Sequence, residues 1–199
     1  MIKNIIFDFG DIFIDLDKPA TGRAMAPFGF TEITPELDSL FKAYEKGIVS
    51  SDDFLETTGN LFPKANKQQL IDAWNAILLD FPLHRLTFLE QLAEEGNYRL
   101  FLLSNTNEIH IQHEKEKMGE HFMRFKNCFE QFYLSYEMGM RKPDAEIFEF
   151  VLQQNGLSVN ETLFIDDTLE NIESASTLGI RTWHLQVGSE DITELNHRL

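Results

Sequence analysis

The feature that most constrains this chain is a short apolar run, residues 5–7, that stops abruptly at the carboxylate of Asp8. An apolar run rich in β-branched and aromatic residues is typical of a buried strand. The segment Phe9-Gly10-Asp11 then predicts a sharp turn, because glycine adopts backbone angles that other residues avoid. Asp8 is therefore expected at the carboxyl end of a strand, the edge where ligands bind in open α/β sheets.

Four further apolar runs have strand character: residues 98–103, 129–134, 163–165 and 181–185. Segments with helical apolar spacing separate them, within 86–95, 108–118, 147–152 and 172–178. Strands that alternate with helices predict an α/β fold. The expected fold is a Rossmann-like parallel sheet flanked by helices.

Residues 18–84 have a different texture, with helical spacing and few strand signals. Apolar residues predict three helices there, one within 37–44, one beginning at 51–53 and one within 70–78. We therefore expect an α/β core domain made of residues 1–17 and 85–199. Residues 18–84 would form an inserted α-helical subdomain.

The charge of the chain excludes several partners. Its 33 acidic and 17 basic side chains give a net charge of −16, which opposes binding to nucleic acid or to an anionic membrane. Cys128 is the only cysteine, so no intrachain disulfide can form, and its apolar neighbours predict a buried thiol at a strand edge. No signal peptide and no segment of membrane-spanning length is found, so we expect a cytoplasmic protein, either a monomer or a homodimer.

Polar residues stand at three of the expected strand ends, Asp8, Ser104-Asn105 and Asp166-Asp167, and Lys142 lies in a loop before a helix. A parallel sheet brings such ends to one edge, so we expect them to share a pocket. Asp8 has the chemistry of a nucleophile that accepts a phosphoryl group. Asp8, Asp166 and Asp167 are hard oxygen ligands of the kind that Mg²⁺ prefers. Ser104 and the main-chain N–H groups after it, from Asn105 onward, would bind phosphate oxygens, and Lys142 would balance the charge of carboxylates and phosphate as a catalytic residue.

Four short motifs resemble, in order, those of the haloacid dehalogenase superfamily of aspartyl-nucleophile phosphatases. They are Phe7-Asp8-Phe9-Gly10, Leu103-Ser104-Asn105-Thr106, Arg141-Lys142-Pro143, and Phe164-Ile165-Asp166-Asp167 with Asn171. The resemblance covers nearly the whole chain and is greatest to a branch of small bacterial sugar-phosphate phosphatases that includes alpha-D-glucose-1-phosphate phosphatase. It implies that residues 18–84 are the family's small helical cap and that the carbonyl of Gly10 contacts the metal. It also implies a Mg²⁺-dependent phosphatase of small phosphorylated metabolites, sugar phosphates among them, with an aspartyl-phosphate intermediate on Asp8.

One position departs from this resemblance. Most phosphatases of the superfamily have a second aspartate two residues after the nucleophile, which protonates the leaving group and activates water, whereas this chain has Gly10 there. General acid–base assistance is worth about two to four orders of magnitude in rate. The sugar-phosphatase branch also carries glycine, and a leaving group that needs little protonation, such as an anomeric oxygen, would reduce the loss. Asp11 could substitute, although one residue further round the turn its side chain is expected to point elsewhere.

Two other functions stay open. A haloacid dehalogenase would use Asp8 to attack carbon without a metal. Gly10 suits that reaction. Two features argue against it: Asp166-Asp167 stand at the metal position, and Phe148 stands where a polar aromatic residue would be expected. A protein that binds phosphorylated ligands or a protein partner with little catalysis would also explain the missing acid.

Several residues outside the motifs permit two interpretations. His110, His113 and Glu114 have helical spacing that could indicate a metal site, but their charged neighbours favour a solvated helix face. Trp74 and Phe81 could line a substrate pocket, but they belong to apolar stripes, which favours the core. Three cations of the inserted subdomain could contact substrate, and nothing in the sequence selects among them: Lys18, Arg23 and Lys46.

Overall fold

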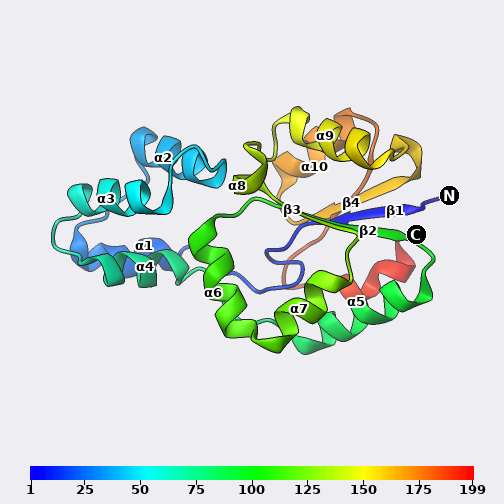
Figure 1. Ribbon diagram of the computed structural model, residues 1–199, viewed down its shortest axis with the longest axis horizontal. Helices are drawn as coiled ribbons and strands as arrows, with labels where there is room; N and C mark the ends of the chain where they lie inside the picture. The colour runs from blue at the N-terminus through cyan, green and yellow to red at the C-terminus, as the bar shows by residue number, and fades with distance from the viewer.

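The computed structural model describes residues 1–199 and contains one sheet of five strands (Figure 1). The strands are β1 (Asn4–Phe7), β2 (Arg99–Ser104), β3 (Gln131–Leu134), β4 (Thr162–Asp166) and β5 (Arg181–His184). Their order is β3-β2-β1-β4-β5, and every neighbouring pair is parallel. The first strand of the chain lies at the centre of the sheet, and the predicted parallel α/β fold is confirmed.

Helices cover both faces of the sheet (Figure 1). One face is covered by α5 (Leu83–Glu95), α6 (Glu108–Met118) and α7 (Glu120–Asn127), and the other by α9 (Ala145–Asn155) and α10 (Leu169–Thr177). Side chains alternate along β1, so Ile5 and Phe7 join the apolar cluster under the first layer and Ile6 joins the cluster under the second. Burial on both faces explains why the strands are continuous apolar runs.

Four helices form a separate bundle at one end of the molecule (Figure 1). They are α1 (Ala20–Met25), α2 (Pro35–Glu45), α3 (Ser51–Leu61) and α4 (Lys67–Asn75). The side chains of Thr34, Ser50 and Asn66 cap α2, α3 and α4 by accepting a hydrogen bond from a backbone N–H of the first turn. The bundle has its own apolar cluster of six buried residues, Met25, Tyr44, Phe54, Leu55, Leu70 and Ala73. The division of the chain at residues 17/18 and 84/85 stays a prediction, and its second boundary falls inside α5.

The remaining elements are short: α8 (Ser135–Met138) and the 3₁₀ helices η1 (Ala26–Phe28), η2 (Val159–Glu161) and η3 (Ile192–His197). The sequence did not predict α1, where Thr21 and Gly22 lower helix propensity, or α7, where charged residues surround the buried Phe122 and Phe125. The predicted place of Cys128 was wrong, because it caps α7, where its thiol donates to the Arg124 carbonyl at 3.3 Å, and β3 begins only afterwards. None of the helices has both the length and the apolar character that crossing a membrane requires.

Candidate active site

The carboxyl ends of the three central strands form the candidate site. Because β2, β1 and β4 are neighbours, Ser104, Asp8 and Asp166 meet at one edge of the sheet, as predicted. Ligand oxygens of Asp8, Asp166 and Asp167 lie within 4.8 Å of one another. A cluster of three carboxylates at this spacing fits the hard-oxygen preference of Mg²⁺.

Lys142 lies between the carboxylates, in the loop that precedes α9. Its Nζ donates to Asp8 Oδ1 and to Asp166 Oδ2, both at 2.6 Å, and the residue is only 1% exposed. Asn105 fixes the loop, because its side chain accepts a hydrogen bond from the Lys142 N–H and donates one to the Lys142 carbonyl, each at 2.8 Å. The side chain of Asn105 therefore positions Lys142, and only its main chain is left for the phosphate contact that the sequence predicts.

The ion pairs and the burial oppose each other in setting the protonation of this cluster. Burial raises the pKa of the Asp8 carboxyl, and Asp166 and Asp167 raise it further, whereas the ammonium of Lys142 lowers it. Burial lowers the pKa of Lys142, but the carboxylates of Asp166 and Asp8 outweigh burial and leave this pKa above its ordinary value. Lys142 therefore supplies a buried positive charge that contacts two of the carboxylates.

Asp166 and Asp167 are held from different directions. Asp166 accepts hydrogen bonds from the Thr168 N–H at 2.8 Å and from the Asn171 side chain at 3.0 Å. The Asn171 side chain thus orients the Asp166 carboxylate. Asp167 pairs with Lys18, whose Nζ lies 2.5 Å from Asp167 Oδ2. Lys18, from the segment that leads into the bundle, is therefore the one of the three cations named above that reaches the carboxylate cluster.

Gly10 and Asp11 form the turn after Asp8. A Cβ atom on Gly10 would lie 2.7 Å from Leu16 Cδ1, so a side chain at position 10 would require the flexible Leu16 side chain to move. Asp11 has a left-handed backbone with φ of 56°, and its carboxylate accepts from the Leu16 N–H at 3.0 Å and pairs with Lys18 at 3.1 Å. Lys18 thus links the carboxylate of Asp11 to that of Asp167, and the expectation that Asp11 points away from the leaving group stays a prediction.

A cavity of about 260 Å³, here the catalytic cavity, contains Asp8, Ser104 and Lys142 in its wall. His110 and Glu114 also line it, so the prediction of a solvated helix face was wrong for both. Glu114 is 1% exposed, neither of its carboxylate oxygens has a hydrogen-bond partner, and burial raises its pKa to about 7. Glu114 lies on the inner face of α6 and interrupts the apolar spacing of that face, so the sequence of α6 resembles that of a solvated helix.

His110 connects the catalytic cavity to the bundle. Burial lowers its pKa to about 4, so the imidazole is neutral at physiological pH. Its Nε2 lies 3.1 Å from the Trp74 carbonyl, and its ring stacks on the Trp74 indole with centroids 5.2 Å apart. Phe81 packs against Phe125 in the core, with ring centroids 5.5 Å apart, and lines neither this cavity nor the one in the bundle.

Comparisons with known proteins agree with one another. The model of a family described as haloacid dehalogenase-like hydrolase matches residues 2–179. The chain is similar to D-ribitol-5-phosphate phosphatase of Bacteroides thetaiotaomicron, with 30% identity over 202 residues that cover 98% of this chain and 97% of that protein. It is also similar to a sesquiterpene phosphatase of Aspergillus oryzae, with 46% identity over 59 residues, 30% of each chain. A HAD family enzyme from Bacteroides thetaiotaomicron, solved as a magnesium complex, matches with a TM-score of 0.87 and 36% identity over 98% of both chains.

Proposed function

We propose a function from one premise: the chain belongs to the haloacid dehalogenase-like hydrolase family. It is a phosphoric monoester hydrolase, and its cofactor is Mg²⁺. Within that class, the proposal is that it hydrolyses small phosphorylated metabolites through a phosphoryl group carried on Asp8. The named relatives include a D-ribitol-5-phosphate phosphatase and a sesquiterpene phosphatase, so both sugar phosphates and apolar phosphate esters belong in the first assays.

The observation that supports this proposal is the shared environment of Asp8. Its carboxylate lies beside Asp166 and Asp167 and pairs with the buried ammonium of Lys142 at 2.6 Å. Asp8, Asp166 and Asp167 would hold Mg²⁺, with the Gly10 carbonyl that the resemblance implies. When bound, the ion neutralises charge between the carboxylates and the phosphate.

The reaction proposed for Asp8 is a double displacement. A carboxylate oxygen of Asp8 bonds to phosphorus while the ester P–O bond breaks, and the alkoxide leaves with the electron pair of that bond and takes a proton from solvent. Water then attacks phosphorus and loses a proton to solvent while the bond between Asp8 and phosphorus breaks, which releases inorganic phosphate and restores the Asp8 carboxylate. Lys142 holds the Asp8 carboxylate and offsets the charge of the incoming phosphate. Position 10 offers no proton to the departing alcohol, so esters of more acidic alcohols are expected to react faster.

The remaining proposals concern the molecule as a whole. We propose that residues 1–17 and 85–199 form the catalytic core and residues 18–84 the cap, supported by the separate apolar cluster of the bundle. The phosphatases among the relatives support a small phosphorylated metabolite as the partner, and the net charge of −16 opposes nucleic acid and anionic membranes. We also propose that the protein is cytoplasmic and is either a monomer or a homodimer.

The proposed function is tested by assaying a panel of phosphate monoesters with and without Mg²⁺. We expect Mg²⁺-dependent release of phosphate by the wild-type protein and a loss of at least about a thousandfold in Asp8→Asn. Asp72→Asn, at an exposed position in the bundle, is the control and should keep full activity. An Asp8→Asn protein with wild-type turnover would contradict the mechanism.

Two further measurements test the two alternative functions. Chloride release from a 2-haloacid that survives chelation would favour dehalogenation by Asp8. Tight binding of phosphate esters without turnover would favour a binding protein.

A further inference from the structure

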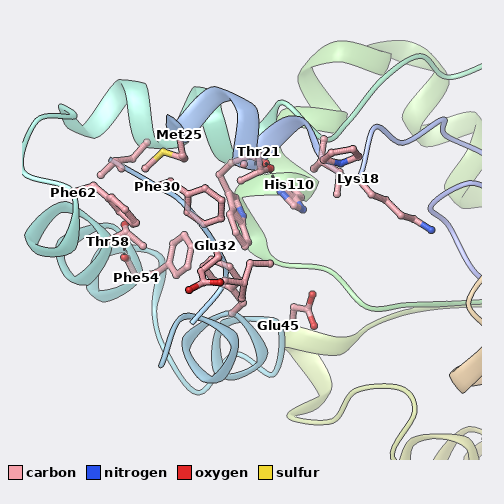
Figure 2. Close-up of a pocket in the computed structure, with 17 residues that line it drawn as sticks. Lys18, Thr21, Met25, Phe30, Glu32, Glu45, Phe54, Thr58, Phe62 and His110 are labelled. Atoms are coloured by element: carbon pink, nitrogen blue, oxygen red, sulfur yellow. Dashed lines mark hydrogen bonds between the residues drawn. The ribbon is translucent and has the colours of Figure 1, made fainter. Parts of the chain in front are cut away.

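A second cavity lies inside the helical bundle and differs in chemistry from the catalytic cavity (Figure 2). This bundle cavity has a volume of about 480 Å³, and nine of its 17 lining residues are hydrophobic. Its walls include five aromatic side chains, Phe30, Phe41, Phe54, Phe62 and Trp74. Small-molecule sites have volumes of about 300 to 1,000 Å³ and are mostly apolar. The bundle cavity therefore has the size and the lining of a binding site.

The bundle cavity adjoins the catalytic cavity. Lys18, Glu45, Ile77 and His110 line both of them. Figure 2 shows Lys18 and Glu45 at one end of the bundle cavity and Phe62 at the opposite end. A phosphate ester bound beside Asp8 can therefore extend its alcohol part past Lys18 and into the bundle.

The hydroxyl and indole N–H groups in the walls of the bundle cavity are already paired within the protein, whereas the exposed carboxylate of Glu32 has no such partner. The Thr58 hydroxyl donates to the Phe54 carbonyl at 2.8 Å, and the Thr21 hydroxyl donates to the Trp74 carbonyl at 3.3 Å. The Trp74 Nε1–H donates to Asn107 Oδ1 at 3.2 Å. The hydroxyl groups of a polyol would thus lose hydrogen bonds to water and find few partners. A hydrocarbon chain loses nothing on entering and gains contact with the rings.

The aromatic walls are also held in place by one another. Trp74 lies 4.9 Å from Phe41 and 4.8 Å from Phe54, measured between ring centroids. Rings packed in this way do not have to be ordered by the ligand, which reduces the entropic cost of binding.

We propose that the bundle cavity binds the hydrocarbon part of the substrate alcohol. The enzyme then hydrolyses phosphate monoesters of apolar alcohols in preference to those of polyols with the same number of carbon atoms. This inference rests on the proposed function, because the ester is still cleaved at Asp8. The products are the apolar alcohol and inorganic phosphate, so no further reactant is needed.

The first test uses n-alkyl phosphates from propyl to decyl, with ribitol 5-phosphate as the polyol matched to pentyl phosphate. The leaving oxygen is primary in every ester, so chain length changes the apolar contact and barely changes the leaving-group pKa. We expect kcat/KM to rise about two- to fourfold for each added CH₂ until the cavity is filled. Pentyl phosphate is expected to exceed ribitol 5-phosphate by at least about tenfold.

Two variants locate the effect in the bundle cavity. Ile33→Glu places a charge in its wall at a residue that is 60% exposed, so the fold should tolerate it. We expect about a tenfold lower kcat/KM for octyl phosphate and little change for propyl phosphate. Ile48→Glu is the matched control, because Ile48 is 72% exposed and lies outside the cavity lining. Thr58→Met adds volume to the wall, and the rise in kcat/KM is expected to stop at a shorter chain.

The outcomes separate this inference from the proposed function. Equal kcat/KM along the alkyl series, or faster hydrolysis of ribitol 5-phosphate than of pentyl phosphate, overturns the inference and leaves the phosphatase proposal standing. Equal losses in Ile33→Glu and Ile48→Glu also overturn it. An absence of Mg²⁺-dependent hydrolysis for every ester overturns the proposed function itself.

Discussion

The sheet edge and the helical bundle bury their side chains in opposite ways. At the edge, Lys142 is fully enclosed with Asp8 and Asp166, and each charge depends on its partners. In the bundle, apolar side chains enclose a cavity in which the Thr58 hydroxyl donates to the Phe54 carbonyl and the Trp74 Nε1–H donates to the Asn107 side chain. Apolar residues of similar size exchange at small cost, whereas a buried ion pair does not tolerate loss of one member. The substrate range can therefore change in the bundle while the chemistry at the edge stays fixed.

Replacing Lys142 is expected to have the largest effect on stability and on turnover. Lys142→Met leaves two buried carboxylates without their cation, so we expect stability to fall by about 3–5 kcal/mol. Turnover should fall by about a hundredfold or more, because the charge of the phosphate is no longer offset. Chemical denaturation and steady-state kinetics measure the two effects. Lys64→Met, at an exposed position beside the bundle, is the control, and an equal response in both variants would show that burial of the charge is unimportant.

Restoring an acid at position 10 is the next largest expected change. Gly10→Asp alone would press on Leu16, so the test pairs it with Leu16→Ala, and Leu16→Ala alone is the control. We expect hydrolysis of alkyl phosphates to rise about tenfold or more and that of an aryl phosphate, whose leaving group needs no proton, to stay nearly constant. Unchanged rates for both ester classes would contradict the view that Gly10 limits protonation of the leaving alcohol.

Glu114 lines the catalytic cavity with both carboxylate oxygens buried and unpaired, and its effect should be the smallest. Its carboxyl has a pKa raised from 4.5 to about 7, so the folded state binds the proton more tightly and loses stability as pH rises between these values. Lys117 opposes this shift. Relative to the wild type, Glu114→Gln should gain about 1–3 kcal/mol between pH 4 and pH 8, measured by urea denaturation. Glu116→Gln, at an exposed position, should show no such gain, and parallel curves for Glu114→Gln and wild type would disprove the account.

The sheet edge was predictable from the sequence because each of its main residues follows an apolar run. Asp8 directly follows a strand, Ser104 and Asp166 end strands, and parallel topology brings the three together. The roles assigned to them remain predictions. The contact of Lys18 with Asp167 and the hydrogen bonds of Asn105 to Lys142 were not predictable, because Lys18 and Lys142 lie in segments outside the strands, which the order of the strands does not place.

The helices of the bundle were predictable from the sequence, but the cavity between them was not. Apolar spacing shows which face of α2, α3 or α4 is buried, but the space left between helices depends on how several side chains meet. Trp74 illustrates the limit, since it packs against the apolar cluster of the bundle, as its apolar stripe predicts, and it also lines the cavity, which the stripe does not show. The burial of Glu114 was not predicted, because the sequence pattern around a buried carboxylate is the same as that around a solvated one.

The most direct test of the central claim is to trap the phosphoryl group on Asp8. Acid-quenched enzyme is treated with borohydride, which reduces an acyl phosphate to the alcohol and so converts a phosphorylated aspartate to homoserine. Peptide mass spectrometry should then find homoserine at position 8, and only when both Mg²⁺ and a hydrolysed ester were present before the quench. Unmodified Asp8 during steady turnover, or homoserine at another position, would contradict the account.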